Sequence, residues 1–189
     1  SKFMDISAIG SGLSIQRATL ESYINALEAM YLVERVAPWT RTDYDRVGKQ
    51  HKIFMTDGGL LRSILGWQFE QVCMDPDRSG KLLETLIFHE LSAQVDASEG
   101  QYSLFHYRDR EKREIDFLLE HEGGGLLGIE VKTGTTIGKN AFKHISWFQT
   151  HLAKKQHFTG IVLYTGKTTI SFGDNLWAIP ISLLWRSPH

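Results

Sequence analysis

Cysteine is nearly absent from the 189 residues: Cys73 is the only one, so no disulfide can form within the chain. A chain without disulfides is typical of a reducing compartment, and we expect a cytoplasmic protein. With a single cysteine, the sequence also has no Cys/His spacing of the kind that predicts a structural zinc site.

Long hydrophobic runs are missing as well. No apolar stretch approaches the roughly 20 residues that a membrane-spanning helix needs. Residues 1–10 lack the basic and then apolar pattern of a secretion signal. We therefore expect no membrane partner. The sequence begins at Ser1 rather than at a methionine, and we expect it to be a piece cut from a longer protein.

Positive charge is not in excess, because 21 Lys and Arg residues stand against 22 Asp and Glu residues, a formal net charge of -1. Proteins whose main function is to bind nucleic acid usually have an excess of Lys and Arg, so the net charge disfavours this class of protein. An ATP site is not expected either. No G-x-x-x-x-G-K-[ST] motif is present, and the glycines of residues 10–12 and 123–125 are typical of turns.

The sequence does have enough apolar residues, 42%, to bury a core, and its length fits one large domain or two small ones. We place the domains at residues 1–66 and 81–189. A linker is expected over residues 67–80, because residues 75–77 (Asp-Pro-Asp) are typical of a turn.

The first domain has the order of elements of a winged helix whose beginning is missing. The expected elements are helices over residues 4–10 and 14–30, strands over residues 31–36 and 52–55, and a short helix capped by Asp57. Ser14 is the expected N-cap of the second helix. On that helix, Arg17 is a candidate DNA contact; the alternative is a module of the same topology that packs against protein.

The second domain is expected to be a mixed sheet flanked by helices, so the whole chain is predicted to be an α/β (α+β) protein. The expected elements are helices over residues 81–95, 140–154 and 181–185, and strands over residues 102–107, 113–120, 126–132, 159–164 and 177–179. A glycine-rich turn over residues 122–125 predicts a hairpin between the second and third of these strands.

Two acidic residues lie where burial is costly. Glu84 is the first residue of the apolar stripe that continues through Ile87, Phe88 and Leu91 on its helix. Asp116 lies in a strand that is apolar on both faces. A buried carboxylate without a partner is strongly unfavourable. We therefore expect each acid to be near the surface, paired with a cation or directed at a metal ion.

Glu130 and Lys132 are two residues apart on one strand, so their side chains are expected on the same face, about 6.6 Å apart along the strand. The hairpin brings Asp116 beside Glu130, and two such carboxylates need a cation between them. Mg²⁺ is commonly held by one or two carboxylates with water and phosphate. We expect Mg²⁺ or Mn²⁺ at Asp116, Glu130 and Glu84, with Lys132 orienting the attacking water.

The ordered set of Glu84 on a helix, Asp116 before a glycine turn and Glu130-x-Lys132 on the next strand resembles the PD-(D/E)xK nuclease superfamily. The resemblance implies strand acids that bind the metal, a lysine that assists the water and a helix acid that often adds a ligand. No Pro-Asp pair stands at Asp116, a departure that the superfamily tolerates widely.

A closer resemblance covers nearly the whole chain. Its segments are residues 18–28, 31–35, 54–60, 80–84, 105–108, 114–117, 129–132 and 180–185. In this order they are similar to the C-terminal region of a family of prokaryotic AAA-type ATPases, in which a winged helix and a nuclease-like domain follow a P-loop ATPase. The resemblance implies that an upstream ATPase domain is the partner of this fragment.

Three functions stay open. The leading one is metal-assisted phosphodiester hydrolysis on nucleic acid at Asp116, Glu130 and Lys132. The second is a catalytically silent module that assembles a homo-oligomer, binds a partner or regulates the missing ATPase, with the acids in a structural salt-bridge network. The third is DNA binding without cleavage. Its candidate contacts are the arginines Arg17, Arg108, Arg110 and Arg113.

Overall fold

The computed structural model describes residues 12, 14–41 and 50–185, and the chain divides into two compact units, one ending at Leu86 and the other beginning at Ile87. The helix expected over residues 4–10 lies outside the described residues. Across the described ranges, no helix combines the length and the apolar character that crossing a bilayer requires.

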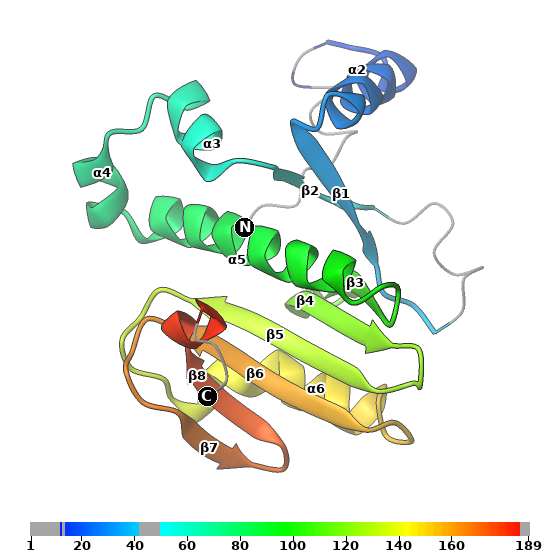
Figure 1. The fold of residues 1–189 in the computed structure, drawn as a ribbon, viewed down its shortest axis with the longest axis vertical. Helices are drawn as coiled ribbons and strands as arrows, with labels where there is room; N and C mark the ends of the chain where they lie inside the picture. Colours follow the sequence, from blue (N-terminus) through cyan, green and yellow to red (C-terminus); the bar gives the residue numbers. More distant parts are fainter. Residues whose placement is uncertain (1–11, 13, 42–49, 186–189) are drawn as a thin grey trace. The chain divides into compact units, whose positions relative to one another are not determined.

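The first unit contains a small core between a helix and two antiparallel strands (Figure 1). Its elements are α2 (Arg17–Ala29), β1 (Val33–Pro38), β2 (Lys52–Met55), α3 (Gly58–Ile64), α4 (Phe69–Met74) and the beginning of α5 (Pro76–Ala97). The core is formed by Leu20 and Ile24 of α2 together with Val33 of β1. Val33 stands opposite Met55 in the strand pair, so both strands close over the same face of α2.

Several local predictions for this unit need correction. Ser14 does not cap α2, because it adopts a left-handed φ of 54° in a turn, whereas an N-cap residue has an extended backbone. Gln16 is the N-cap of α2.

Asp57 is confirmed as the cap of α3, accepting the N–H of Leu60 at 2.6 Å. The turn predicted at residues 75–77 is instead the start of α5, where Asp75 accepts the N–H of residue 77 at 2.9 Å. Proline is favoured at such a first helical position.

A buried ion pair lies inside the first unit. Lys52 of β2 and Glu84 of α5 are only 4% and 5% exposed, and the Lys52 ammonium donates a hydrogen bond to Oε1 of Glu84. Loss of one partner from such a pair leaves the other charge buried without compensation, which is strongly destabilising. The carboxylate expected in the metal site therefore has a cation partner within its own unit.

The second unit is a mixed sheet, as the sequence predicts. Its strands are β3 (Tyr102–Arg108), β4 (Glu114–His121), β5 (Leu126–Lys132), β6 (Phe158–Tyr164), β7 (Ile170–Gly173) and β8 (Leu176–Pro180). Within this unit they follow the order β3-β4-β5-β6-β8-β7. The pairs β3/β4, β4/β5 and β7/β8 are antiparallel, whereas β5/β6 and β6/β8 are parallel. The strand β7 was not predicted, because it is short and its side chains are mostly exposed.

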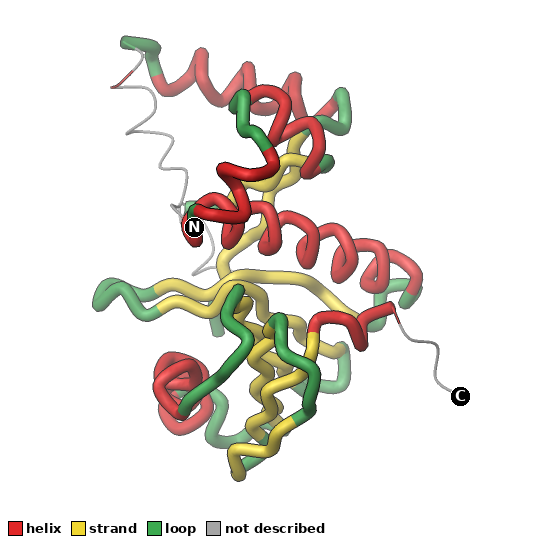
Figure 2. Tube along the Cα trace, turned by 90° about the vertical axis from the view of Figure 1, so that its left-hand side faces the viewer, coloured by secondary structure: helices red, strands yellow, loops and turns green. Residues whose placement is uncertain are grey.

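Helices pack against this sheet. They are η2 (Lys139–Phe142), α6 (Lys143–His151), η3 (Ile181–Trp185) and the part of α5 that follows residue 86. Phe88 of α5 stacks on Phe117 of β4 with ring centroids 6.4 Å apart. Figure 2 shows α6 beside the strands, where Phe148 packs on Phe158 of β6 at 5.5 Å. A Cβ on Gly160 would lie 2.3 Å from Ile145 Cγ2, so this close approach of α6 requires glycine.

The turn between β3 and β4 is fixed by one carboxylate. Asp109 accepts the backbone N–H of Arg113 at 2.9 Å and its guanidinium Nε at 2.6 Å. Burial tends to raise the pKa of Asp109, but these hydrogen bonds and the positive charge of Arg113 outweigh it and hold the pKa below the ordinary 3.8. Burial and the neighbouring Asp109 carboxylate raise the pKa of the Tyr107 hydroxyl.

The first prediction concerns the buried ion pair. We expect Lys52→Met and Glu84→Gln each to lower the free energy of unfolding by about 3 kcal/mol, because each leaves a buried charge without its partner. Lys81→Met is the matched control, since the Lys81–Asp77 pair lies on the surface of the same helix and is worth under about 1 kcal/mol. Urea denaturation measures the difference. Equal effects of Lys52→Met and Lys81→Met would contradict the assigned pair.

The second prediction concerns pH. A pKa that is lower in the folded than in the unfolded chain stabilises the fold above the unfolded pKa, and this stabilisation is lost as the pH falls through the folded pKa. At pH 7 we expect Asp109→Asn to reduce the free energy of unfolding by about 1 kcal/mol, a value discounted for solvent screening. As the pH falls below the ordinary carboxyl pKa of 3.8 and through the lower pKa of the folded state, the unfolding midpoints of variant and wild type in urea should converge. A difference that is constant with pH would exclude the charge of Asp109 as its cause.

Candidate functional site

The ladder between β4 and β5 ends at the pair Phe117/Ile129. Asp116 precedes Phe117 in β4, and its side chain takes the place of the backbone carbonyl that would continue the ladder. The Oδ2 of Asp116 accepts the N–H of Val131 at 2.9 Å. A bulge accompanies this break, because the register of β3 against β4 shifts between Phe105 and Tyr107. Bulges commonly redirect a side chain near functional sites.

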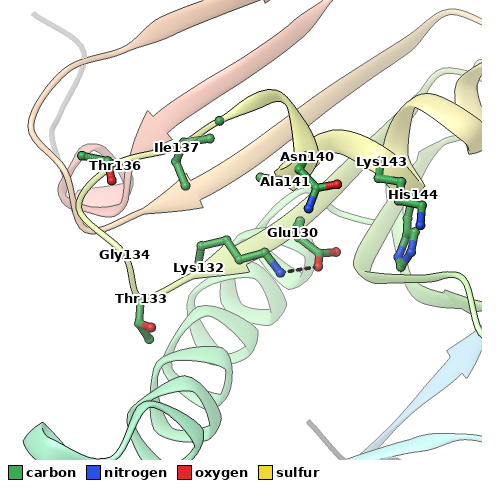
Figure 3. Close-up of a pocket in the computed structure, with 11 residues that line it drawn as sticks. Glu130, Lys132, Thr133, Gly134, Thr136, Ile137, Asn140, Ala141, Lys143 and His144 are labelled. Carbon is green, nitrogen blue, oxygen red and sulfur yellow. Dashed lines mark hydrogen bonds and ion pairs between the residues drawn. The ribbon is translucent and has the colours of Figure 1, made fainter.

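Glu130 and Lys132 lie side by side at the end of β5 (Figure 3). The Lys132 Nζ donates to Glu130 Oε1 at 2.8 Å. The side chain of Lys132 is 42% exposed and that of Glu130 only 14%. Because Val131 is the residue between them, the carboxylate of Asp116 meets the backbone directly beside this pair. The structure thus brings Asp116, Glu130 and Lys132 together at one strand end.

A pocket of about 580 Å³ opens at this strand end. The residues that line it are Glu130 and Lys132 of β5, the loop residues Thr133, Gly134, Thr136, Ile137 and Gly138, and Asn140, Ala141, Lys143 and His144 of η2 and α6 (Figure 3). The volume is within the range of small-molecule sites, about 300–1,000 Å³. The position outside the carboxyl ends of the parallel strands β5 and β6 is where ligands bind in open sheets of this kind.

The loop that forms one wall of the pocket is held in place by the segment after β6. Thr165 Oγ1 donates to the carbonyl of Thr133 at 2.8 Å, and its backbone N–H donates to the carbonyl of Gly134 at 3.3 Å. A Cβ on Gly166 would lie 2.8 Å from the carbonyl oxygen of Thr135, so only glycine lets the two segments approach this closely. The wall is therefore formed before any ligand arrives.

The opposite wall is fixed by β4. Nδ1 of His144 lies 3.1 Å from the carbonyl oxygen and 3.3 Å from the backbone nitrogen of Glu114. This contact orients the first turn of α6, which carries Lys143 and His144. These wall residues were not predicted from the sequence. The signal that would have found them is their place at the start of the helix that follows the parallel strand β5.

The remaining predicted site residues have other surroundings. Glu84 pairs with Lys52 in the first unit, where Arg17 is the exposed first residue of α2. Three arginines surround the β3–β4 turn: Arg108, Arg110 and Arg113. Arg108 pairs with Glu114 at 3.1 Å, and Arg113 pairs with Asp109 at 2.6 Å and with Glu111 at 2.9 Å. The guanidinium of Arg113 also lies 3.6 Å from the ring centroid of Trp147. Arg110 is exposed in the turn.

The acidic side chains at the strand end are those of Asp116 and Glu130. Among the described residues, no three side chains of His, Cys, Asp or Glu are grouped so that they could hold a metal ion. Asp116 and Glu130 supply hard oxygen donors from two adjacent strands. Mg²⁺ is commonly bound by one or two carboxylates and completes its shell with water and phosphate, so a proposal of Mg²⁺ or Mn²⁺ at this strand end rests on these two carboxylates alone.

Comparison with known proteins gives matches of two kinds. The family model "Domain of unknown function (DUF8612)" matches residues 1–71, and "Domain of unknown function (DUF4143)" matches residues 79–184. Uncharacterized proteins of Mycobacterium bovis and Mycobacterium tuberculosis are each 22% identical over 172 residues, which is 91% of this chain and 37% of theirs. The chain thus spans little more than a third of these relatives, and no solved structure matches it. Because the second model covers more than half of the sequence, the chain belongs to the DUF4143 family.

Proposed function

We propose that the second unit is a metal-dependent phosphodiesterase that acts on nucleic acid, with its active site at the end of β5. One observation carries the proposal: the carboxylate of Asp116 meets β5 directly beside Glu130, whose own carboxylate has the Lys132 ammonium at 2.8 Å. The restriction-endonuclease-like identity of the sheet, and the winged-helix identity of the first unit, belong to the same proposal.

The cation would supply Lewis acidity and a more acidic bound water. The chain itself supplies orientation and charge. Oδ2 of Asp116 accepts the Val131 N–H, and we assign this carboxylate to the metal. Glu130 adds a second carboxylate from the floor of the pocket. The exposed ammonium of Lys132 holds the attacking water against the phosphorus and offsets the negative charge that develops as the P–O bond breaks.

Glu84 has a weaker place in this proposal. Its carboxylate is buried against the ammonium of Lys52. To act as a third metal ligand, the Glu84 carboxylate would have to leave Lys52. The buried ammonium of Lys52 would then have no negative charge beside it, which is strongly destabilising. We therefore assign cation binding to Asp116 and Glu130.

A second function is favoured by a specific observation. Each predicted acid also has a partner within the protein: Asp116 the N–H of Val131, Glu130 the ammonium of Lys132, and Glu84 that of Lys52. Acids that are satisfied by partners within the protein are expected in a catalytically silent module, and such a module would bind or regulate an upstream ATPase. Calorimetry with Mn²⁺ separates the two functions, because the silent module predicts no binding heat for folded wild-type protein.

The third prediction tests hydrolysis. We expect Mn²⁺-dependent cleavage of single- or double-stranded DNA, and a loss of about 100-fold in rate in Lys132→Ala, as for the removal of one group that stabilises developing charge. Lys139→Ala is the matched control. Lys139 is an exposed lysine of η2, seven residues after Lys132, and it does not line the pocket. Cleavage that persists in Lys132→Ala would come from a contaminant or another site and would remove the proposal.

The fourth prediction separates the two roles of Asp116. Asp116→Ala leaves the N–H of Val131 without its acceptor, and we expect it to lower the free energy of unfolding by about 1–2 kcal/mol. Asp116→Asn keeps an oxygen acceptor and should lose less than half of that. Both variants should lose Mn²⁺ binding in calorimetry. Unchanged stability of the alanine variant in urea would show that the hydrogen bond contributes nothing, and unchanged Mn²⁺ binding would exclude Asp116 as a ligand.

A further inference from the structure

The pocket has a second polar wall that the proposed hydrolysis does not use. Asn140, Lys143 and His144 line it, facing the strand wall that carries Glu130 and Lys132 (Figure 3). These three side chains are hydrogen-bond donors or can act as such. A wall of donors on one side and a carboxylate with an ammonium on the other is suited to a ligand that carries a phosphate group.

The charge balance of the pocket favours an anion. Glu130 and Lys132 neutralise each other at 2.8 Å. Lys143 is exposed, and within the described part of the chain it makes no ion pair. One positive charge therefore remains at the pocket before any cation binds. Lysine ammonium groups commonly bind phosphate as point charges.

His144 is held so that one ring nitrogen is left for a ligand. Its Nδ1 contacts the backbone of Glu114 at the start of β4, and Nε2 is the remaining polar atom of the ring. Because β4 fixes the ring, a hydrogen bond from Nε2 to a phosphate oxygen costs little further side-chain ordering. His151 on the same helix is also held, since its Nδ1 lies 2.8 Å from the carbonyl oxygen of Trp147 and its ring stacks on Trp147 at 4.7 Å, but it does not line the pocket.

The surroundings of the pocket disfavour a long polyanion. No arginine of the described ranges lines the pocket; Arg108 and Arg113 lie at the β3–β4 turn and are paired with carboxylates, and the chain has a net charge of -1. Duplex binding draws its affinity from many phosphate contacts by basic side chains. The volume of about 580 Å³ instead fits a unit of nucleotide size.

We propose that Asn140, Lys143 and His144 bind the phosphate group of a nucleotide-sized ligand, either a mononucleotide or the phosphorylated end of a single strand. The inference rests on the proposed function, since it names the ligand of the same pocket. Phosphate binding by this wall needs no metal, so the two can be tested separately.

The test is a titration of the intact chain with thymidine 5′-monophosphate in the presence of a metal chelator, followed by calorimetry and by the side-chain ¹⁵N resonances of histidine. We expect Lys143→Ala and His144→Gln each to weaken binding about tenfold, the loss of one charge-assisted hydrogen bond. The Nε2 resonance of His144 should shift on titration. Glu130→Gln should strengthen binding, because it removes a negative charge from the pocket while it abolishes Mn²⁺ binding.

Lys139→Ala and His151→Gln are the matched controls, one lysine and one histidine of the same elements that do not line the pocket. The inference is overturned if the nucleotide does not bind, if the control variants weaken binding as much as the wall variants, or if a 20-base-pair duplex binds more tightly than a 5′-phosphorylated single strand. Nucleotide binding that follows this pattern without any Mn²⁺-dependent cleavage would support the inference while it contradicts the proposed hydrolysis.

Discussion

One hydrogen bond organises the candidate site: the carboxylate of Asp116 accepts the N–H of Val131 in place of a backbone carbonyl of β4. A side chain can occupy that place only because the β4–β5 ladder ends at the preceding pair and β4 carries a bulge there. Beyond this point β4 and β5 are no longer paired, and Glu130 and Lys132 of β5 line the pocket there. The acid at the end of the β4–β5 ladder is thus the same acid that the proposed chemistry requires.

Packing on both sides of the sheet keeps this strand end in place. Phe117, next to Asp116, stacks on Phe88 of α5, and α6 approaches β6 closely enough to require Gly160. Interiors are packed at crystal-like density, so small displacements of such layers are costly. His144 and the anchored loop after Lys132 extend the same rigidity to the pocket walls. A site with this support is largely formed before a ligand binds, which lowers the entropic cost of binding.

The sequence predicts the elements whose patterns are local. The strand β5 was expected over residues 126–132 and has these bounds, because an apolar run there follows a glycine turn. The helix cap at Asp57 was equally local. The bulge at Asp116 escaped prediction, since it is a property of two strands and not of one. The start of α5 escaped because Asp-Pro-Asp is equally compatible with a turn and with a capped helix that begins at Pro76.

For the site, strand alternation and a hairpin predict that Asp116, Glu130 and Lys132 lie together. These patterns were not enough for contacts between distant segments. Lys52 lies 32 residues from Glu84, and no periodicity predicts that these two charges are buried against each other. The position of the wall formed by Asn140, Lys143 and His144 was equally unpredictable, because it depends on how α6 packs against β4.

The most direct measurement is paramagnetic broadening of backbone amide resonances by substoichiometric Mn²⁺ on the ¹⁵N-labelled chain. The account predicts selective loss of the signals of Asp116 and of Glu130 through Lys132, with the Val131 amide among the first to disappear. These amides belong to Asp116 itself and to the residues of β5 that its carboxylate and the Glu130–Lys132 pair contact. Broadening centred elsewhere, or spread evenly over surface acids, would contradict a metal site at the end of β5.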